Sequence, residues 1–224
     1  MKHKKGTGLT AAGLLLIAAA LFLSAHHIWQ AQSAGQSSKE AAQQVVRQTP
    51  VSQSTDFERE RREKESDAPL ESPDPEREMP TVEVDGNQYI GMLDIPALSL
   101  SLPVMDTWSE AKLKLAPCRY LGSAYQDNLI IAAHNYRQHF GNLKDLKVGD
   151  EVVFTDVEGS AFFYTVAETG TLDGSAVEEM RQGDWALTLF TCTPGGKRRV
   201  TVRCERTETA GAETGAGLQG GTGR

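Results

Sequence analysis

The chain has 224 residues, of which 39% are hydrophobic and 7% aromatic, and its formal net charge is −7 at pH 7. This length suits one domain of ordinary size with additional segments. The negative charge argues against nucleic-acid binding, which needs Lys and Arg clustered on one face. Three cysteines without a CxxC pair argue against a zinc ribbon and a thioredoxin-type redox site.

Residues 1–29 predict a signal-anchor that crosses a membrane once. Lysines precede Leu9 to Ala25, a run of 17 residues without a charge. Continuation of this run through Trp29 brings it to about the ~20 residues that a bilayer needs, with the lysines cytoplasmic and Trp29 at the interface. The alternative is a signal peptide cleaved after Ala25 or Ala34. Both interpretations place the rest of the chain outside the cytoplasm.

Residues 30–81 predict a polar linker, disordered or partly helical. Gln, Ser, Ala and Glu dominate this segment, and its mixed-charge run at 56–65 suits a solvated helix. Such a composition buries too little apolar surface to offset the entropy of ordering. Residues 207–224 are rich in Gly, Thr and Ala and predict a disordered tail. The folded domain is therefore expected at residues 82–206.

Short apolar segments separated by turn residues predict a mainly β domain. Residues 128–133 are nearly all apolar, as in a strand buried on both faces. The predicted strands cover residues 89–95, 98–104, 128–133, 151–156, 161–167, 187–190 and 200–204. Short helices are expected near residues 108–115, 141–146 and 175–181. About eight short strands with turns between them indicate a closed barrel or a sandwich.

Cys192 and His134 each stand where an apolar strand ends and a polar loop begins. Strand ends of a barrel expose side chains at a shared rim, so the two residues can meet there. Lys197, Arg198 and Arg199 follow Cys192, and a cationic environment favours a thiolate nucleophile. The alternative for Cys192 is a buried cysteine that acts as a small hydrophobic residue.

The segment Thr188-Leu189-Phe190-Thr191-Cys192, with Arg199 seven residues later, resembles the signature of the sortase family. Residues 128–135 resemble that family's histidine segment, and 192 − 134 = 58 residues is a separation of the family's kind. Further similar segments are Ile95-Pro96, Leu102-Pro103-Val104 and the Gly-Asp turn within residues 146–150. The resemblance extends from Tyr89 to Arg206.

The resemblance implies an eight-stranded β-barrel that works as a cysteine transpeptidase without a cofactor or metal. Cys192 would attack an LPxTG-like sorting signal of a secreted protein between Thr and Gly. His134 would protonate the leaving amine and deprotonate the incoming one, which comes from a peptidoglycan precursor. Arg199 would hold the substrate and stabilise the oxyanion.

Residues beside the catalytic positions are predicted to bind substrate. These are Thr191, which could shape the oxyanion hole or simply cap its strand, and Asn135. Arg199 is preferred to Arg198 because the family's arginine stands five residues before a small residue that closes the strand, the place of Cys204. Arg198 would then point to the other face of the strand.

Three further features leave alternatives open. His139 is expected to be a surface loop residue rather than a metal ligand. Acidic residues within 168–184 indicate solvated charge, although some sortases bind calcium near there. Cys118 and Cys204 are hypothesised to be adjacent and able to pair; the alternative is two separate buried thiols.

Two rival functions and one sortase subclass make different predictions for this sequence. An L,D-transpeptidase carries its arginine two residues after the cysteine, so the separation of seven excludes it. A non-catalytic membrane-anchored binding or scaffold module predicts that Cys192 can be replaced without consequence. A pilin-polymerising sortase carries a second membrane segment and an aromatic Asp-Pro lid, whereas Asp74-Pro75 is followed here by Glu76. An anchoring sortase close to class B or class D is therefore expected.

Overall fold

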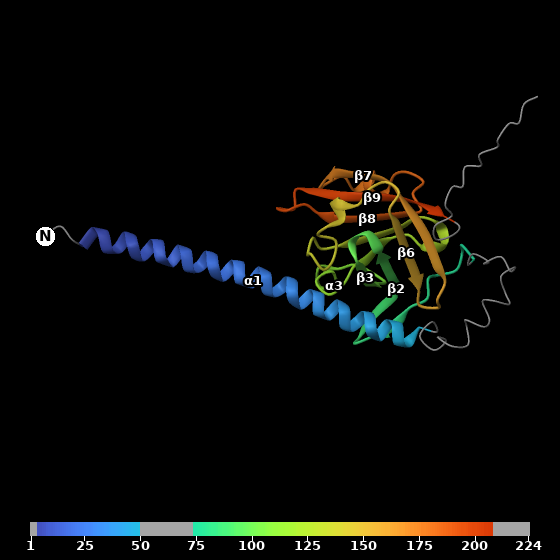
Figure 1. Ribbon diagram of the computed structural model, residues 1–224, viewed down its shortest axis with the longest axis horizontal. Coiled ribbons are helices and arrows are strands. Elements are labelled where there is room, and N and C mark those ends of the chain that lie inside the picture. The colour runs from blue at the N-terminus through green and yellow to red at the C-terminus, as the bar shows by residue number, and fades with distance from the viewer. Residues whose placement is uncertain (1–3, 50–73, 208–224) are drawn as a thin grey trace, which may run out of the picture.

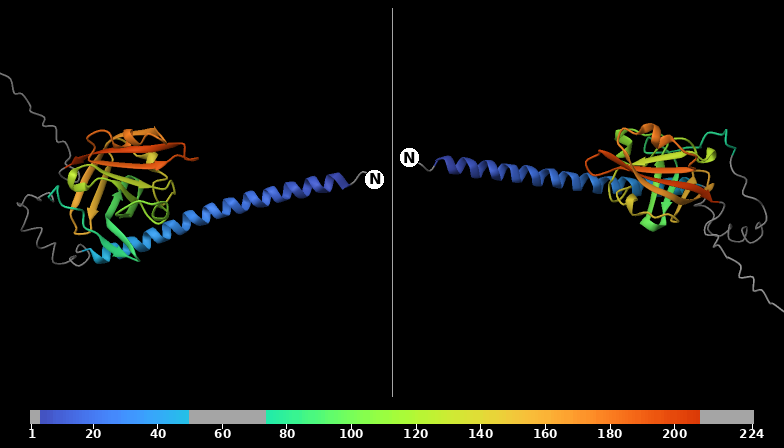
Figure 2. Two further views of the ribbon diagram at one scale, coloured as in Figure 1. Left: turned by 180° about the vertical axis from the view of Figure 1, so that it is seen from behind. Right: turned by 90° about the horizontal axis from the view of Figure 1, so that it is seen from above.

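The computed structural model describes residues 4–49 and 74–207, which form a β-barrel and one long helix (Figure 1). Helix α1 (Lys4–Gln48) is continuous over 45 residues. Its N-terminal half projects away from the barrel in every view (Figure 2). The mixed-charge run at 56–65 and tail residues 208–224 lie outside the described residues.

Eight strands form the closed barrel, and a ninth extends its sheet. The strands are β1 (Val82–Val84), β2 (Asn87–Ile95), β3 (Leu100–Met105), β4 (Cys118–Leu121), β5 (Leu129–Ala133), β6 (Glu151–Asp156), β7 (Ala161–Asp173), β8 (Leu187–Cys192) and β9 (Arg198–Thr207). Their order from β2 is β2-β3-β4-β5-β8-β9-β7-β6, and pairing of β6 with β2 closes the circle. Strand β1 pairs with β2 outside it. The predicted closed eight-stranded barrel is confirmed.

Strands β1 and β4 were missed by the sequence analysis. They have only three and four residues, too few for an alternating pattern to stand out. Strand β5 is buried at every position, as its apolar run predicts. It pairs in parallel with β8, so the chain needs a crossover between them, which residues 134–186 supply with β6, β7 and α4.

Short helices occupy the connections between strands. They are α3 (Glu110–Leu113), α4 (Val177–Arg181), and the 3₁₀ turns η2 (Pro96–Leu98), η3 (Ala124–Gln126) and η4 (Leu143–Asp145). Three of them lie inside the segments predicted to be helical. Helix α3 begins after Ser109, whose hydroxyl accepts a hydrogen bond from the Lys112 backbone N–H at 3.1 Å.

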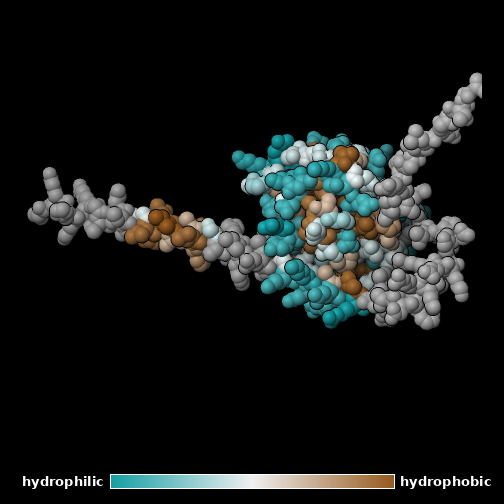
Figure 3. All heavy atoms as spheres, in the orientation of Figure 1, coloured by the Kyte–Doolittle hydropathy of each residue, from teal (hydrophilic) through white to brown (hydrophobic). Residues whose placement is uncertain are grey.

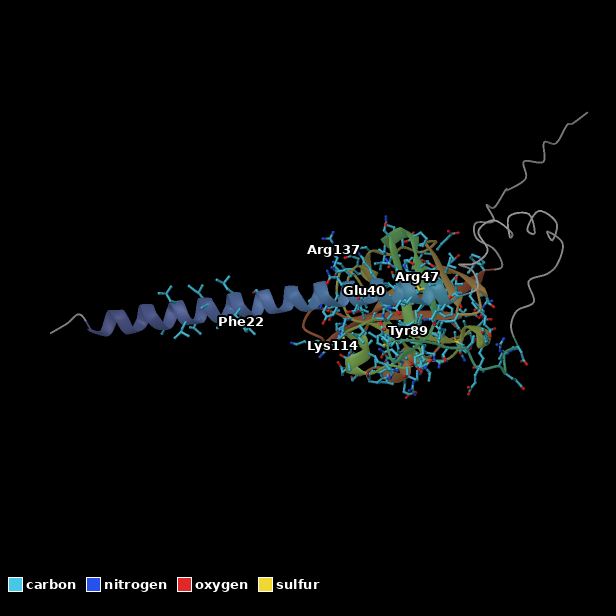
Figure 4. The ribbon with its side chains drawn as sticks, turned by 90° about the horizontal axis from the view of Figure 1, so that it is seen from below. Phe22, Glu40, Arg47, Tyr89, Lys114 and Arg137 are labelled. Carbon is cyan, nitrogen blue, oxygen red and sulfur yellow. The ribbon has the colours of Figure 1, made fainter. Side chains whose placement is uncertain are left out.

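The C-terminal turns of α1 pack on the outside of the barrel. The buried residues recur every three or four positions, which places them on one helix face: Gly35, Ser38, Ala41, Val45 and Thr49. Ala41 and Val45 share a cluster with Tyr89 and Met105, and Gln44 donates to the Asp85 carboxylate at 3.1 Å. Figure 4 shows this part of α1 lying across the barrel near Tyr89.

The docked part of α1 lies within residues 30–81, the segment predicted to be a polar linker. Its first part, up to Gln48, continues α1. The segment has few large apolar residues, so its composition indicated a solvated chain. A narrow stripe of small side chains at helical spacing nevertheless covers the apolar patch of the barrel around Val84 and Tyr89.

The projecting part of α1 carries large apolar side chains that are exposed (Figure 3). They are Leu14, Leu15, Leu16, Ile17, Leu21, Phe22 and Leu23. Among the described residues, no helix combines the length and the apolar character needed to cross a membrane. The membrane-spanning segment predicted for residues 1–29 is thus not found among them.

The hypothesised bridge between Cys118 and Cys204 is wrong, because all three cysteines are free. Cys118 lies on β4 in the cluster beneath α1, whereas Cys204 lies on β9 in the barrel core. Strands β5 and β8 separate them. Three strand spacings amount to roughly 14 Å, well beyond the ~4.4–6.8 Å between Cα atoms that a disulfide allows.

Thiol counting is expected to give different numbers for native and unfolded protein. Burial raises the pKa of Cys118 and of Cys204 to about 12, so both resist thiol reagents in the folded chain. Native protein should therefore react rapidly at Cys192 alone, which is half-buried, and protein denatured without reductant should react at all three. Ellman titration and mass mapping of the modified sites measure both numbers. A single reactive thiol after denaturation would contradict the structure.

Candidate active site

A cavity of about 290 Å³ opens where β5 and β8 end. Its walls come from the segment around α3, the segment around α4, and the ends of β5, β8 and β9. The side chains that line it include Trp108, Glu110, Tyr120, His134, Asp173, Met180, Phe190, Thr191, Cys192 and Arg199. On β8, Leu187 and Leu189 point into the barrel core. Phe190 and Cys192 alternate with them and therefore face the cavity.

Cys192 and Arg199 face each other across the β8–β9 hairpin. They are the last register pair of these antiparallel strands. The hairpin loop is tight, with the Thr193 N–H donating to the Arg198 carbonyl at 2.9 Å. Gly195 and Gly196 both have positive φ, a conformation in which glycine costs least. The loop thus holds Arg199 directly opposite Cys192.

His134 reaches the same edge through the parallel pairing of β5 with β8. Ala133 pairs with Thr191, so the next residues along the two strands are His134 and Cys192. Adjacent strands lie about 4.8 Å apart. The Thr191 hydroxyl donates to the Ala133 carbonyl at 2.8 Å and fixes this register. Three neighbouring strands therefore bring His134, Cys192 and Arg199 together at the cavity.

The surroundings of His134 favour a neutral imidazole. Burial lowers its pKa below the ordinary value near 6.5, the negative charge of Glu110 raises it, and the positive charge of Lys114 lowers it. Its Nε2 atom is buried without a hydrogen-bond partner in the part of the chain that the structure describes. A neutral ring with a free nitrogen can accept a proton from an attacking group.

An aromatic contact supports the loop after His134. The rings of His134 and Tyr136 lie 4.9 Å apart between centroids, and those of Tyr136 and His139 lie 5.7 Å apart. His139 is fully buried, so its expected place at the surface is wrong. The loop folds back on itself, with the Phe140 N–H donating to the His134 carbonyl at 3.1 Å, and this turn carries His139 inward.

Arg199 and Arg198 point to different sides of β9. The Arg199 guanidinium lines the cavity and donates from Nη1 to the Gly196 carbonyl at 2.9 Å. Arg198 is exposed and donates to the Thr171 carbonyl at 3.1 Å on β7. Arg199 is thus the arginine on the cavity side, the side that its strand phase predicts.

The two residues predicted to bind substrate have different positions. Thr191 lines the cavity, but its hydroxyl is buried and already engaged with Ala133. Asn135 is exposed and does not line the cavity. Near the acidic segment 168–184, no three His, Cys, Asp or Glu side chains of the described chain converge as metal ligands would.

A row of aromatic rings beside Cys192 was missed by the sequence analysis. Trp108 lies 5.7 Å from Tyr120, and Tyr120 meets Phe190 edge-on at 5.3 Å, between ring centroids. All three line the cavity. Phe190 could have been found by strand alternation, because it stands two residues before Cys192. Trp108 and Tyr120 lie far away in the sequence, and only the folded barrel brings them to this row.

Arg203 was also missed, and it anchors the cavity wall formed by α4. Its guanidinium donates to the Met180 carbonyl at 2.8 Å, the Glu179 carbonyl at 2.7 Å and the Thr188 hydroxyl at 2.9 Å. These carbonyls belong to the last turn of α4, which a cation stabilises. Arg203 is 7% exposed, and burial lowers its pKa. It therefore holds Met180 in place.

Comparisons with known proteins agree on one family. The chain matches the family described as Sortase domain over residues 93–207. It is 30% identical over 149 residues to sortase A of Bacillus anthracis, covering 62% of this chain and 69% of that protein. The structure of sortase A from Corynebacterium diphtheriae has a TM-score of 0.51 and 21% identity, covering 57% of this chain and 64% of that one. Sortase C1 of Streptococcus agalactiae, in complex with MTSET, has a TM-score of 0.50 and 23% identity, covering 59% and 73%.

Replacement of Arg203 by methionine is expected to weaken substrate binding more than turnover. The variant loses hydrogen bonds from a charged donor, so α4 loosens and KM for a peptide substrate should rise about tenfold or more, while kcat changes little. Steady-state kinetics measure both. Arg206→Met on the same strand is the control, because Arg206 contacts Asp127 and Ala124 rather than α4. An unchanged KM in Arg203→Met would contradict the anchoring role.

Proposed function

The chain belongs to the sortase family of cell-wall transpeptidases, and we propose that it acts through a thioacyl intermediate on Cys192. The observation that carries this proposal is the meeting of a thiol, an imidazole and a guanidinium at the ends of three adjacent strands. All three line one cavity, whose remaining walls are largely apolar. A nucleophile, a proton carrier and an oxyanion donor are the groups that acyl transfer needs.

In the first half of the reaction, Cys192 attacks the carbonyl carbon of the scissile peptide bond. The thiol proton passes to His134, whose free Nε2 can receive it. Arg199 stabilises the negative charge on the carbonyl oxygen. His134 then gives the proton to the leaving amine, the C–N bond breaks, and a thioester remains on Cys192.

In the second half, an amine attacks the thioester carbon. His134 removes a proton from the amine as the new C–N bond forms. The sulfur leaves as thiolate, takes up that proton from His134, and restores the resting pair. The two halves exchange one amine for another, so no cofactor is consumed.

For the substrates, the motif resemblance supports an LPxTG-like sorting signal and an amine of a peptidoglycan precursor. The backbone at Thr191 lies in the cavity wall and could contact the peptide, and Asn135 could contact it from the rim. The rings of Tyr120 and Phe190 suit apolar side chains of such a peptide.

For the location, we propose attachment to the outer face of the cell membrane through α1. The exposed apolar side chains from Leu14 to Leu23 support it, since exposed apolar surface of this extent marks an interaction site. The docked turns of α1 would then hold the catalytic barrel beside its anchor.

Replacement of Cys192 by alanine is expected to abolish both acyl-enzyme formation and transpeptidation, since the nucleophile is lost while the fold is kept. A panel of quenched sorting-signal peptides with an amine acceptor, followed by mass spectrometry, detects the acyl-enzyme and the product. Cys118→Ala is the matched control and should retain both, because Cys118 lies beneath α1. Undiminished ligation by Cys192→Ala would overturn the role of Cys192, whereas the absence of acyl-enzyme and product from the unaltered chain would favour the non-catalytic binding module.

Arg199→Ala is expected to lower kcat by about 10²–10³, the usual cost of a lost oxyanion donor. Arg198→Ala should cost far less, because its side chain lies on the β7 side of the strand. Arg199→Lys should also be poor, since an ammonium lacks the guanidinium fork. Turnover of the best peptide measures all three variants. Equal losses of kcat in Arg199→Ala and Arg198→Ala would contradict the assignment of the oxyanion donor to Arg199.

A further inference from the structure

Two carboxylates line the cavity, and their surroundings differ. Asp173 accepts hydrogen bonds from the Ser175 N–H at 3.0 Å and the Ser175 hydroxyl at 2.6 Å. These hydrogen bonds lower the pKa of Asp173 most, and the charges of Arg198 and Arg199 lower it further. The Glu110 carboxylate makes no hydrogen bond or ion pair with the residues that the structure describes. Glu110 is therefore the lining carboxylate that is available to a ligand.

Glu110 belongs to the His134 side of the cavity, whereas Asp173 belongs to the Arg199 side. Asp173 ends β7 and pairs with Arg198, next to the arginine that lines the cavity. Glu110 opens α3, and its charge acts directly on the imidazole of His134. The cavity lining thus includes a guanidinium that interacts with Asp173 and an unengaged carboxylate that interacts with His134.

Trp108 stands two residues before Glu110 and lines the same cavity. Its side chain is 47% exposed, which is high for a tryptophan held in an aromatic row. Tyr120 supports it from one side at 5.7 Å between ring centroids. An indole face beside a carboxylate is a pair of groups that recognises an alkylammonium, through cation–π attraction and charge.

We propose that Trp108 and Glu110 form a subsite for the ammonium group of the amine acceptor, next to His134. This inference rests on the proposed function and names the place where the second substrate of that reaction enters. Arg199 takes the first substrate's carbonyl oxygen, and Glu110 with Trp108 takes the acceptor's nitrogen. The cavity lining therefore offers a group to each of the two charges that the reaction brings together.

The subsite explains how a protonated amine becomes a nucleophile here. Primary amines have a pKa of about 8 for an α-amino group and about 10 for a lysine side chain, so they arrive largely as ammonium. Glu110 and Trp108 bind that form. His134, kept neutral by burial, takes one proton from the ammonium and releases it to solvent. The free electron pair on nitrogen then attacks the thioester carbon. The C–S bond breaks, the second proton passes from nitrogen through His134 to the leaving sulfur, and an amide forms.

A purely structural role for Glu110 predicts something different. Acidic residues are common in the first turn of a helix, where they stabilise it. Helix α3 has only four residues, and Ser109 already caps it. A structural role would lower stability and impair both halves of the reaction. Under the subsite role, loss of Glu110 specifically weakens the binding of a charged amine in the second half of the reaction.

The experiment separates the two halves in the full chain. An ester analogue of the best sorting-signal peptide forms the acyl-enzyme while releasing an alcohol, so no amine takes part in that step. Triglycine, a charged amine, or hydroxylamine, which is uncharged at neutral pH, then captures the thioester in competition with water. Rates of acylation, hydrolysis and capture are followed by mass spectrometry. The variants are Glu110→Gln, Glu110→Lys, Trp108→Phe and Trp108→Ala.

For Glu110→Gln, we expect a KM for triglycine about threefold to tenfold higher, with a larger rise for Glu110→Lys. Any effect of the lost charge on His134 should appear equally in acylation, hydrolysis and capture by hydroxylamine, so the rise with triglycine is measured relative to hydroxylamine. Trp108→Phe should keep most of the triglycine capture that Trp108→Ala loses. Glu151→Gln, an exposed residue on β6, is the matched control and should behave like the unaltered chain.

Two outcomes would overturn the subsite. One is an unchanged KM for triglycine in Glu110→Gln; the other is an equal loss with triglycine and hydroxylamine. Failure of the proposed function looks different, because the unaltered chain would then form no acyl-enzyme from the ester in the first step.

Discussion

The parallel pairing of β5 with β8 is the constraint on which the site depends. Parallel neighbours end at the same edge of a sheet, so the residues that follow them emerge side by side. The register from Leu129 to Ala133 carries this alignment to His134 and Cys192, and the Thr191 hydroxyl holds it with one hydrogen bond to the main chain. A slip by one residue would turn Cys192 toward the barrel interior.

The crossover that this parallel pairing requires also supplies a wall of the cavity. Residues 134–186 leave the rim, form β6 and β7, and return through α4. Arg203 fastens the last turn of α4 to the face of the sheet that carries Cys192 and Arg199. One strand, β9, therefore provides a cavity-lining guanidinium at Arg199 and a structural guanidinium at Arg203. Arg203 is buried and holds α4, whereas Arg199 lines the cavity and is accessible to a ligand.

Each basic side chain of the cavity interacts with an acidic one. The guanidinium of Arg199 lies beside Asp173, and the imidazole of His134 lies within the field of Glu110. Burial weakens the protonated form of His134 more than Glu110 strengthens it, so the imidazole stays neutral and can accept a proton. The docked turns of α1 lie outside this region and cover a separate apolar patch of the barrel.

The sequence by itself determined the β-rich barrel, the strand ends at His134 and Cys192, and the strand phase that puts Arg199 and Arg198 on different sides of β9. These features follow from local periodicity and from a short motif. Only the tertiary structure decided the short strand β4, the burial of His139, the separation of Cys118 from Cys204, and the docking of α1. Each depends on which distant segments become neighbours, because closing the barrel brings together residues that no local pattern relates. The same closure gathers Trp108, Glu110 and Arg203 around the motif, and for that reason they could not be read from the chain alone.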